Sequence, residues 1–260
     1  MKKIDSDDID RLPGVRIEGD DTFSFRCYPG IGCFNRCCRN LNLFLYPYDV
    51  LCLKNALGIS SDAFLDRYVD IVLRSGNYFP EVLLRMSEDD ENTCPFLAPS
   101  GCTVYTERPD TCRAFPFEKG ILYDADTKKD VPIYLYRPPE FCLGQYESDE
   151  WTISTWTGDQ DAGRHHKMTI RWAELKRLFQ TDPWGREGPQ GPKAKMAFMA
   201  VYNVDQFRGF VFQSSFLRRY KVKTAMLKKL KADDVDLLKF GFAWVKFFLW
   251  GIQGKHIRIR

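Results

Sequence analysis

The sequence has no cysteine after position 142 of its 260 residues, although it contains nine cysteines in all. Histidine is scarce, with three in the chain, which argues against a hydrolytic zinc site built on histidine ligands. There is no Walker A, GxGxxG, HExxH or GxSxG pattern, so the signatures of nucleotide-binding folds, zinc proteases and α/β-hydrolases are missing. These absences remove several common enzyme classes and direct attention to the cysteines.

Long apolar runs are also absent. No uninterrupted run approaches the roughly 18 residues that a membrane span needs, and the polar start Met1–Asp5 shows no secretory signal. The net charge of +3 is small, which argues against nucleic acid as a partner. We therefore expect a cytoplasmic protein without a membrane span, in a compartment where thiols stay reduced and disulfides are rare.

Eight of the nine cysteines form two groups. The members of the first group are Cys27, Cys33, Cys37 and Cys38, and those of the second are Cys94, Cys102, Cys112 and Cys142. Thiols that merely filled apolar gaps would be spread along the whole chain, so we predict that all eight are metal ligands. The ninth, Cys52, lies in an apolar stretch with helical character and is expected to be an ordinary buried thiol.

Thiolate is a soft ligand that selects zinc, iron–sulfur clusters or copper(I). A tetrahedral zinc ion and a cubane iron–sulfur cluster each need four ligands, so two groups of four cysteines fit two sites, or one site with cysteines left over. The side chains of adjacent residues diverge, so Cys37 and Cys38 are poorly placed to bind one ion together. The adjacent pair therefore favours a polynuclear centre or two sites over a single zinc finger.

We predict an α+β fold, rich in helix, in which loops wrap the cysteine metal core. Three parts are expected: a polar N-terminal arm over 1–22, a cysteine-cluster metal-binding domain over 23–182, and an all-helical extension over 193–260 packed on it. The run Asp182–Pro192, with three prolines and three glycines, is the best linker between the last two.

Apolar spacing, turn residues and caps place the elements along the chain. Helices are predicted at 47–57, 62–74, 168–179 and 234–250, short strands at 82–86 and 103–105, a hairpin between 121–123 and 131–136, and a strand or a helix start at 151–156. The last helix is almost entirely apolar from Phe240 to Leu249, which favours burial against the core over a position on a membrane surface.

Two polar stretches have a plain and a functional interpretation. The run from Arg218 to Lys231 holds seven basic residues and no acid, which fits RNA, an anionic membrane or an acidic partner, but a solvated helix face is favoured. The pair His165-His166 has the chemistry of ligands or general bases, but a solvated turn is favoured because Arg164 and Lys167 flank it.

Several motifs recur in the order found in one known family. They are Cys37-Cys38-Arg39, Cys94-Pro-Phe-Leu97, Cys102-Thr-Val-Tyr-Thr-Glu-Arg-Pro109, Cys112-Arg-Ala-Phe-Pro116 and Cys142-Leu-Gly144. Over about residues 23–145 the chain resembles the YkgJ-type cysteine-cluster family, described as a zinc- or iron-chelating domain with a CxxCxxCC signature. The segments Tyr202–Val204 and Phe207–Phe212 resemble the extension of its longer members. One departure concerns Cys27, because the first two spacings here are five and three residues, where the signature has two and two.

The resemblance implies a bound metal centre, most often an iron–sulfur cluster, and for most members no reaction. We expect a role in electron transfer or cluster handling, with a protein or redox partner that the sequence does not identify. The alternatives are a structural zinc protein that acts through protein contacts, and a protein-modifying enzyme, because a flagellin lysine methylase carries a related cysteine cluster. Arg108 and Arg113 are predicted to stabilise the negative charge of the thiolates, the alternative being two surface charges.

Overall fold

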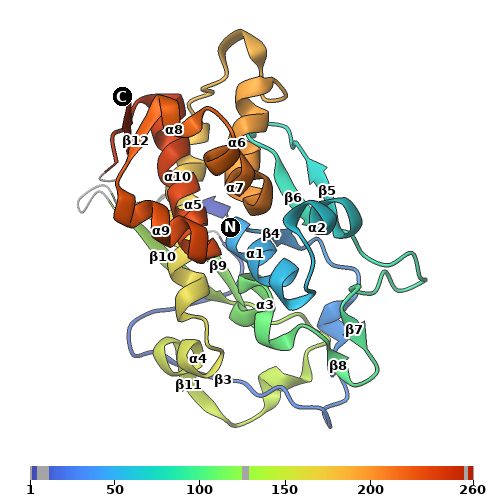
Figure 1. The fold of residues 1–260 in the computed structure, drawn as a ribbon. Coiled ribbons are helices and arrows are strands. Elements are labelled where there is room, and N and C mark those ends of the chain that lie inside the picture. The colour runs from blue at the N-terminus through green and yellow to red at the C-terminus, as the bar shows by residue number, and fades with distance from the viewer. Residues whose placement is uncertain (1, 5–11, 125–128, 255–256, 260) are drawn as a thin grey trace. The chain divides into compact units, whose positions relative to one another are not determined.

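The computed structural model describes residues 2–4, 12–124, 129–254 and 257–259 (Figure 1). Two compact units emerge from the contacts: residues 1–43 with 85–173, and residues 44–84 with 174–260. Each unit thus draws on two separate segments of the chain. This grouping cuts across the expected limits at 23–182 and 193–260, which stay a prediction as domain boundaries.

The first unit contains a four-stranded sheet in the order β1-β9-β10-β2. Strands β9 (Phe117–Asp124) and β10 (Lys129–Tyr136) form the predicted antiparallel hairpin, and both are longer than expected. Strand β1 (Lys2–Ile4) pairs parallel to β9, and β2 (Val15–Ile17) pairs antiparallel to β10. The polar N-terminal segment therefore supplies both outer strands of this sheet.

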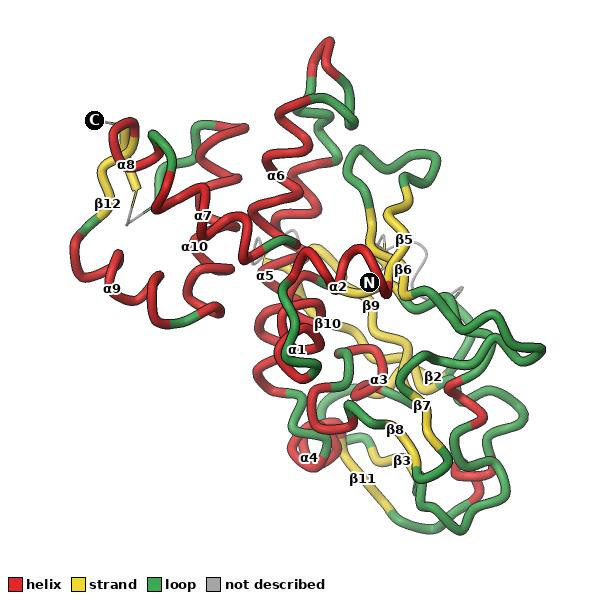
Figure 2. Tube along the Cα trace, turned by 45° about the vertical axis from the view of Figure 1, so that its right-hand side comes forward, coloured by secondary structure: helices red, strands yellow, loops and turns green. Residues whose placement is uncertain are grey.

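Short elements surround this sheet. Strand β3 (Thr22–Ser24) pairs with β11 (Glu150–Thr152), and β7 (Leu97–Ala98) with β8 (Gly101–Cys102). The helices are α3 (Asp110–Ala114), α4 (Ile153–Asp159) and the start of α5 (Gly163–Phe179), with 3-10 turns at Arg36–Cys38, Tyr105–Glu107 and Leu143–Tyr146. Loop dominates around β7, β8 and α3 (Figure 2), which fits the predicted loop-wrapped cysteines.

An aromatic cluster forms the core beneath these loops. The buried members are Ile17, Phe23, Phe25, Phe117, Cys142 and Trp156. The rings of Phe23 and Phe117 meet edge to face with centroids 4.7 Å apart, and Phe25 meets Trp156 in the same way at 5.4 Å. Because Cys142 belongs to this cluster, one of the predicted ligands is held by the packing itself.

The second unit combines a three-stranded sheet with most of the helices. The sheet has the order β4-β6-β5, formed by β4 (Phe44–Leu45), β6 (Glu81–Leu84) and β5 (Val69–Val72). The helices are α1 (Pro47–Ala56), α2 (Ser61–Tyr68), α6 (Pro192–Tyr202), α7 (Val204–Gln213), α8 (Phe216–Arg219), α9 (Thr224–Ala232) and α10 (Asp234–Trp250). A 3-10 turn covers Gly185–Glu187.

Helix α10 is the core helix that its apolar sequence predicts. Asp233 caps its start by accepting from the Val235 and Asp236 amides, and Gly251 ends it in the left-handed conformation. Trp244 is fully buried and lies within 6 Å of the rings of Phe207, Phe210 and Phe216. The helix therefore buries its apolar surface in the interior of its own unit.

Several predicted elements need correction. The helix expected over 62–74 stops at Tyr68, because the β-branched run Val69–Val72 pairs with β6 instead. The strand expected at 103–105 is wrong, because strand pairing ends at Cys102 and a 3-10 turn follows.

The C-terminal segment also departs from the all-helical extension in one place. Strand β12 (Tyr220–Val222) pairs antiparallel with β13 (Ile257–Ile259). Within the proposed linker, Trp184 is 1% exposed and its ring stacks on Phe179 at 5.5 Å. None of the described helices is both long enough and apolar enough to cross a bilayer.

Candidate metal centre

The two cysteine groups, distant in sequence, are joined through the backbone of the first unit. The amide of Cys94 donates to the carbonyl oxygen of Cys38 over 2.9 Å, and that of Asn40 donates to Asn92 over 3.0 Å. Between these bonds, Arg39 and Thr93 form an antiparallel bridge. The end of the first group therefore lies directly beside the start of the second.

A second junction brings Cys142 to the beginning of the first group. The Arg26 amide donates to the Gly144 carbonyl over 3.1 Å, and a Cβ on Gly144 would collide with the Arg26 carbonyl oxygen. Only glycine permits this approach, which explains the Cys142-Leu-Gly144 motif. Next to it, the Leu143 amide donates to the Cys33 sulfur over 3.2 Å.

The thiols at the second junction raise one another's pKa values. Burial raises the pKa of Cys27, and the neighbouring Cys33, Cys142 and Cys38 raise it further. Burial likewise raises the pKa of Cys142, and Cys33 adds to the increase. A hydrogen bond from the Gly144 amide lowers this pKa in part. Closely spaced sulfurs resist carrying several negative charges together, and a bound cation would relieve this repulsion.

The adjacent cysteines face different neighbours. A hydrogen bond between their side chains raises the pKa of Cys37 and lowers that of Cys38 to about 7. Burial also raises the pKa of Cys37, as do the neighbouring Cys27 and Cys112. Cys38 lies near Cys94 and Cys102 and raises the pKa of both, in addition to that of Cys27. The pair thus connects the two groups of thiols.

Backbone amides point at the sulfurs of the second group. Burial raises the pKa of Cys94 to about 11, and the amide of Phe96, two residues on, acts in the opposite direction. In the same way, the amide of Val104 lowers the pKa of Cys102, and the amide of Gly144 lowers that of Cys142. An amide two residues after a cysteine stabilises its thiolate, as the environment of a metal-bound sulfur requires.

Both predicted arginines are buried and are not surface charges. Arg108 is 8% exposed, lies over the ring of Tyr105 at 3.8 Å, and donates to the Tyr105 carbonyl and the Gln160 side chain. Burial lowers the pKa of Arg108, while Cys112 and Cys102 are close enough to oppose this effect. Its charge is therefore available to the second cysteine group.

Arg113, 3% exposed, has a different set of contacts. Its guanidinium donates to the carbonyl oxygens of Arg108, Gln160 and Thr106. These bonds fasten the turn that precedes Cys112 to the end of α4. The direct N–H···S contacts expected of Arg108 and Arg113 stay a prediction.

Residues 26–144, just under half of the chain, match the family model CxxCxxCC, described as a "putative zinc- or iron-chelating domain". This segment is a CxxCxxCC domain. The match contains all eight cysteines of the two groups and confirms the resemblance drawn from the motifs. No curated protein and no solved structure shows a significant match to the chain.

The donor set of the CxxCxxCC domain fits the metals in its description. All of its candidate ligands are thiols, the ligand type that zinc and iron–sulfur clusters share, and all nine cysteines of the chain are free of disulfides. Among the described residues, no three His, Cys, Asp or Glu side chains converge closely enough to hold an ion as they stand. Metal binding therefore requires the thiols to draw together from their present spacing.

Cys52 stands apart from this domain's thiol groups. It lies in α1 of the second unit, between the buried residues Leu51 and Leu53, and is 6% exposed. This position is the one expected of a thiol that fills apolar space.

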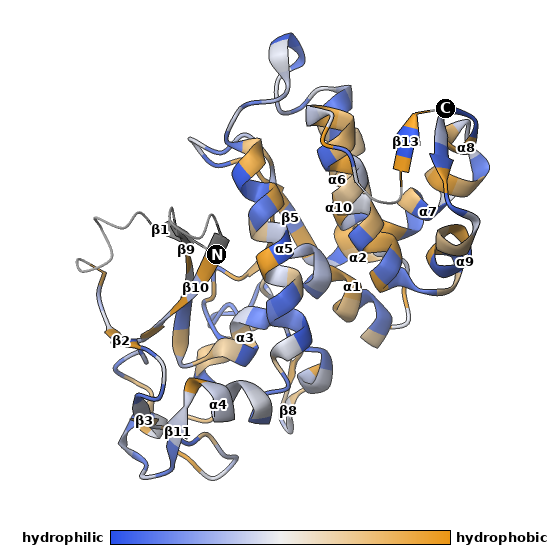
Figure 3. Cartoon of the chain, turned by 90° about the vertical axis from the view of Figure 1, so that its left-hand side faces the viewer, coloured by the Kyte–Doolittle hydropathy of each residue, from blue (hydrophilic) through white to orange (hydrophobic). Residues whose placement is uncertain are grey.

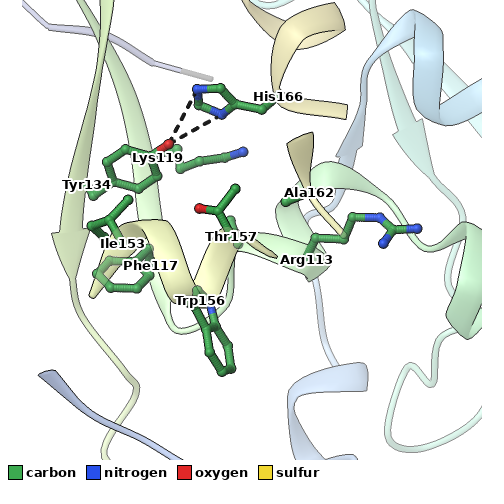
Figure 4. A pocket seen from close by; sticks show the side chains of 10 residues that line it. Arg113, Phe117, Lys119, Tyr134, Ile153, Trp156, Thr157, Ala162 and His166 are labelled. Atoms are coloured by element: carbon green, nitrogen blue, oxygen red, sulfur yellow. Dashed lines mark hydrogen bonds between the residues drawn. The ribbon is translucent and has the colours of Figure 1, made fainter. Parts of the chain in front are cut away.

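A buried polar cluster that we did not predict lies beside α3. Asp110 is fully buried, forms an ion pair with Lys119 at 2.6 Å and accepts from the Thr169 hydroxyl at 2.9 Å. The Tyr134 hydroxyl lies 3.4 Å from the His166 ring nitrogens (Figure 4). A small cavity opens here, lined by Arg113, Ala114, Phe117, Lys119, Tyr134, Ile153, Trp156, Thr157, Ala162 and His166.

The solvated turn predicted at His165-His166 is wrong. Helix α5 begins at Gly163, so both histidines lie in its first turns; His165 is 4% exposed, and His166 stacks on Tyr134. Burial lowers the pKa of His166, and Lys119 lowers it further. One signal was present in the sequence: Lys119 shares a strand face with Phe117 and Ile121, where a buried charge demands a partner.

Proposed function

We propose that the CxxCxxCC domain carries an iron–sulfur centre with a role in electron transfer or cluster handling. The observation that carries the proposal is the position of Cys37 and Cys38 between two sets of thiols. Cys27 and Cys112 raise the pKa of Cys37. Cys38 raises the pKa of Cys94 and Cys102 as well as that of Cys27, so the adjacent pair lies beside both sets. Adjacent cysteines that serve different metal atoms suit a polynuclear centre better than one tetrahedral ion.

The residues that would hold the centre are the eight cysteines between Cys27 and Cys142. When bound, an iron–sulfur centre supplies one-electron redox chemistry, whose potential depends on net charge, on hydrogen bonds to sulfur and on solvent exposure. The chain contributes to the first two through Arg108 and through the amides near Cys94, Cys102 and Cys142. Cys27 is exposed, so the site has a solvent-facing side through which a redox partner or a cluster acceptor can approach.

The test is the metal content of the whole chain purified without oxygen. Iron and acid-labile sulfide in comparable amounts, with a brown colour that reversibly bleaches on reduction, are expected. Zinc without sulfide would replace the proposal with the structural zinc alternative. Neither metal at about one equivalent per chain would overturn metal binding itself, because even a single structural site is saturated at that ratio.

The role is tested on the loaded protein. Rapid reversible reduction with the cluster retained supports electron transfer, whereas transfer of iron and sulfide to an apo-ferredoxin supports cluster handling. A centre that is neither reducible nor transferable would sink both roles and leave a structural one.

A further inference from the structure

The second unit carries a run of cations that the metal chemistry does not use. Its members are the exposed residues Arg218, Arg219, Lys221, Lys223, Lys228, Lys229, Lys231 and Arg258, which we call the basic face. Seven of them lie along α8, β12 and α9, and β13 adds the eighth from the C-terminal segment. Among the described residues, none of the eight forms an ion pair with a carboxylate of this chain.

The nearest acids in the sequence are engaged elsewhere. Asp233 caps α10, Asp234 pairs with Lys54 at 2.9 Å and also with Arg208, and Asp236 pairs with Lys239 at 3.2 Å. Neutralisation of the basic face therefore has to come from outside the chain.

The pairing of β12 with β13 concentrates this charge. Lys221 stands directly opposite Arg258 in the antiparallel ladder, and both side chains are exposed. Like charges at directly opposed positions destabilise a strand pair. The other face of this ribbon packs on its own unit, through the buried Ile257 and through Tyr220, whose ring contacts Phe216 and Phe247. The fold keeps the unfavourable pair on the face that is left exposed, which indicates that the charge serves a purpose other than stability.

Apolar side chains accompany the cations at the same end of the chain. Ile259, across the ribbon from Tyr220, is 70% exposed, and Ile252, just after α10, is 44% exposed. Figure 3 shows β13 banded in hydrophobic and hydrophilic colours close to α8. Side chains alternate along a strand, so Ile259 lies on the opposite face of the ribbon from Lys221 and Arg258. The cations themselves are the feature that an anionic lipid surface attracts.

We propose that the basic face docks on the surface of an anionic membrane, with Lys221 and Arg258 at phospholipid headgroups. Nucleic acid fits less well, because single strands are bound by exposed aromatic rings between the cations. The exposed aromatic side chains of the described residues, Tyr78, Tyr105 and Tyr146, all lie outside the basic face. The proposal concerns surface binding and does not involve the metal centre.

The experiment is co-sedimentation of the full chain with vesicles of phosphatidylcholine alone and with about 30 mol% phosphatidylserine added, at low and high salt. Binding is expected only with the anionic lipid and should disappear at about 0.5 M salt, where the charges are screened. The variant Lys221→Gln/Arg258→Gln should bind roughly 25-fold more weakly, because each cation near an anionic surface contributes about fivefold. The variant Ile259→Ser should bind within about twofold of the wild type, because Ile259 lies on the other face of the ribbon.

The matched control is Lys193→Gln/Lys195→Gln, which removes the same charge from exposed positions of α6 in the same unit. It should bind within about twofold of the wild type, since its lysines lie outside the basic face. Equal weakening in the control would overturn the assignment to this face, as would equal binding to neutral vesicles.

Two more measurements separate the proposal from its rivals. If a fluorescent RNA or DNA oligonucleotide binds more tightly than the vesicles, with the same dependence on Lys221 and Arg258, the partner of the basic face is nucleic acid and the membrane proposal is overturned. Binding to neither would leave a solvated surface and refute the proposal. Thermal unfolding without lipid should show that Lys221→Gln keeps or gains stability, because it removes the like-charge pair.

Discussion

The amide of Cys94 donates a 2.9 Å hydrogen bond to the carbonyl of Cys38, so one backbone bond fixes the second cysteine group against the first. Ordinary folding forces therefore bring the thiol groups into the same region, and a metal has only to draw the sulfurs together. Substitutions of the ligands and substitutions of the surrounding residues should therefore have different effects.

Replacement of Cys94 by Ser should release most of the metal and lower Tm by roughly 10 °C, because metal binding is coupled to folding and 1 kcal/mol shifts Tm by about 2–4 °C at this size. Cys37→Ser and Cys112→Ser should act in the same direction. The control Cys52→Ala should keep the wild-type metal content, since Cys52 lies in apolar space. Metal analysis and thermal unfolding of the variants measure both effects; full metal retention in Cys94→Ser would refute its assignment.

The two sets of thiols suggest a dissection of the centre. These sets are defined by which thiols affect each other's pKa and differ from the two groups in the sequence. Cys33 raises the pKa of Cys27 and Cys142. Cys38 raises the pKa of Cys94 and Cys102, and Cys102 raises that of Cys94. If each set holds its own metal, Cys33→Ser and Cys102→Ser should each lose about half of the iron, because a cluster needs its full set of thiolates. We expect this partial loss, read from the iron and sulfide per chain; complete loss in both variants would instead show a single shared centre.

The buried pair of Asp110 and Lys119 predicts a large effect from a change to a residue that is not itself a proposed ligand. Lys119→Met should destabilise the domain by about 3–5 kcal/mol, because it leaves the carboxylate of Asp110 charged and buried without its cation. Adding Asp110→Asn to the same protein should restore part of the loss. Denaturant unfolding of both variants decides the matter, and a double variant less stable than the single one would contradict the charge argument.

Acid sensitivity is expected from His166. The pKa of its imidazole is lowered in the folded state by burial and by Lys119, so the unfolded chain binds the proton more readily. Stability is therefore complete above about pH 6.5 and falls as the pH decreases through the lowered value. Glu81 and Asp205, whose pKa values are also lowered, contribute only below about pH 4.5, so unfolding between pH 5.5 and 7 separates the histidine from these carboxylates.

His166→Gln should reduce this dependence in metal-free protein, where acid cannot act by releasing metal. Cys38, whose pKa is about 7, adds a slope of its own, which is the same in wild type and variant. The same acid slope in wild type and variant would place its origin elsewhere. At the alkaline end, the Tyr134 pKa, raised to about 12 by burial and by Asp110, predicts a further loss of stability above about pH 10, because the unfolded chain loses that proton first.

The elements that the sequence predicted correctly are those with a local cause. Helix α1 follows from Pro47 and the turn at Gly58, and α10 follows from the Asp233 cap and Gly251. The cysteine motifs likewise identified the CxxCxxCC domain, because the residues around each cysteine recur in the family's order, although the first two spacings differ from the signature.

The errors arose where distant segments compete with local preference. The run Val69–Val72 has helical spacing with α2, yet its Val and Ile side chains favour an extended backbone and β6 lies beside it as a pairing partner. The histidines of α5 looked solvated because Tyr134 and Lys119, which surround His166, come from strands far away in sequence. For the arginines the sequence left surface charges open as the alternative, because the carbonyl oxygens that hold Arg113 become neighbours only after folding.

The close approach of α10 to α6 gives a prediction that separates packing from helix propensity. A Cβ atom on Gly241 would collide with the carbonyl oxygen of Ala200 in α6, so Gly241→Ala has to push the two helices apart. A loss of about 1–3 kcal/mol is expected, the usual cost of overpacking. In α7, a Cβ on Gly209 would meet nothing nearer than the Gln213 side chain at 3.7 Å. Gly209→Ala should therefore stabilise the protein by about 0.5–1 kcal/mol through helix propensity alone. Opposite signs in denaturant unfolding are the expected result, and stabilisation by both substitutions would show that α6 and α10 do not pack this closely.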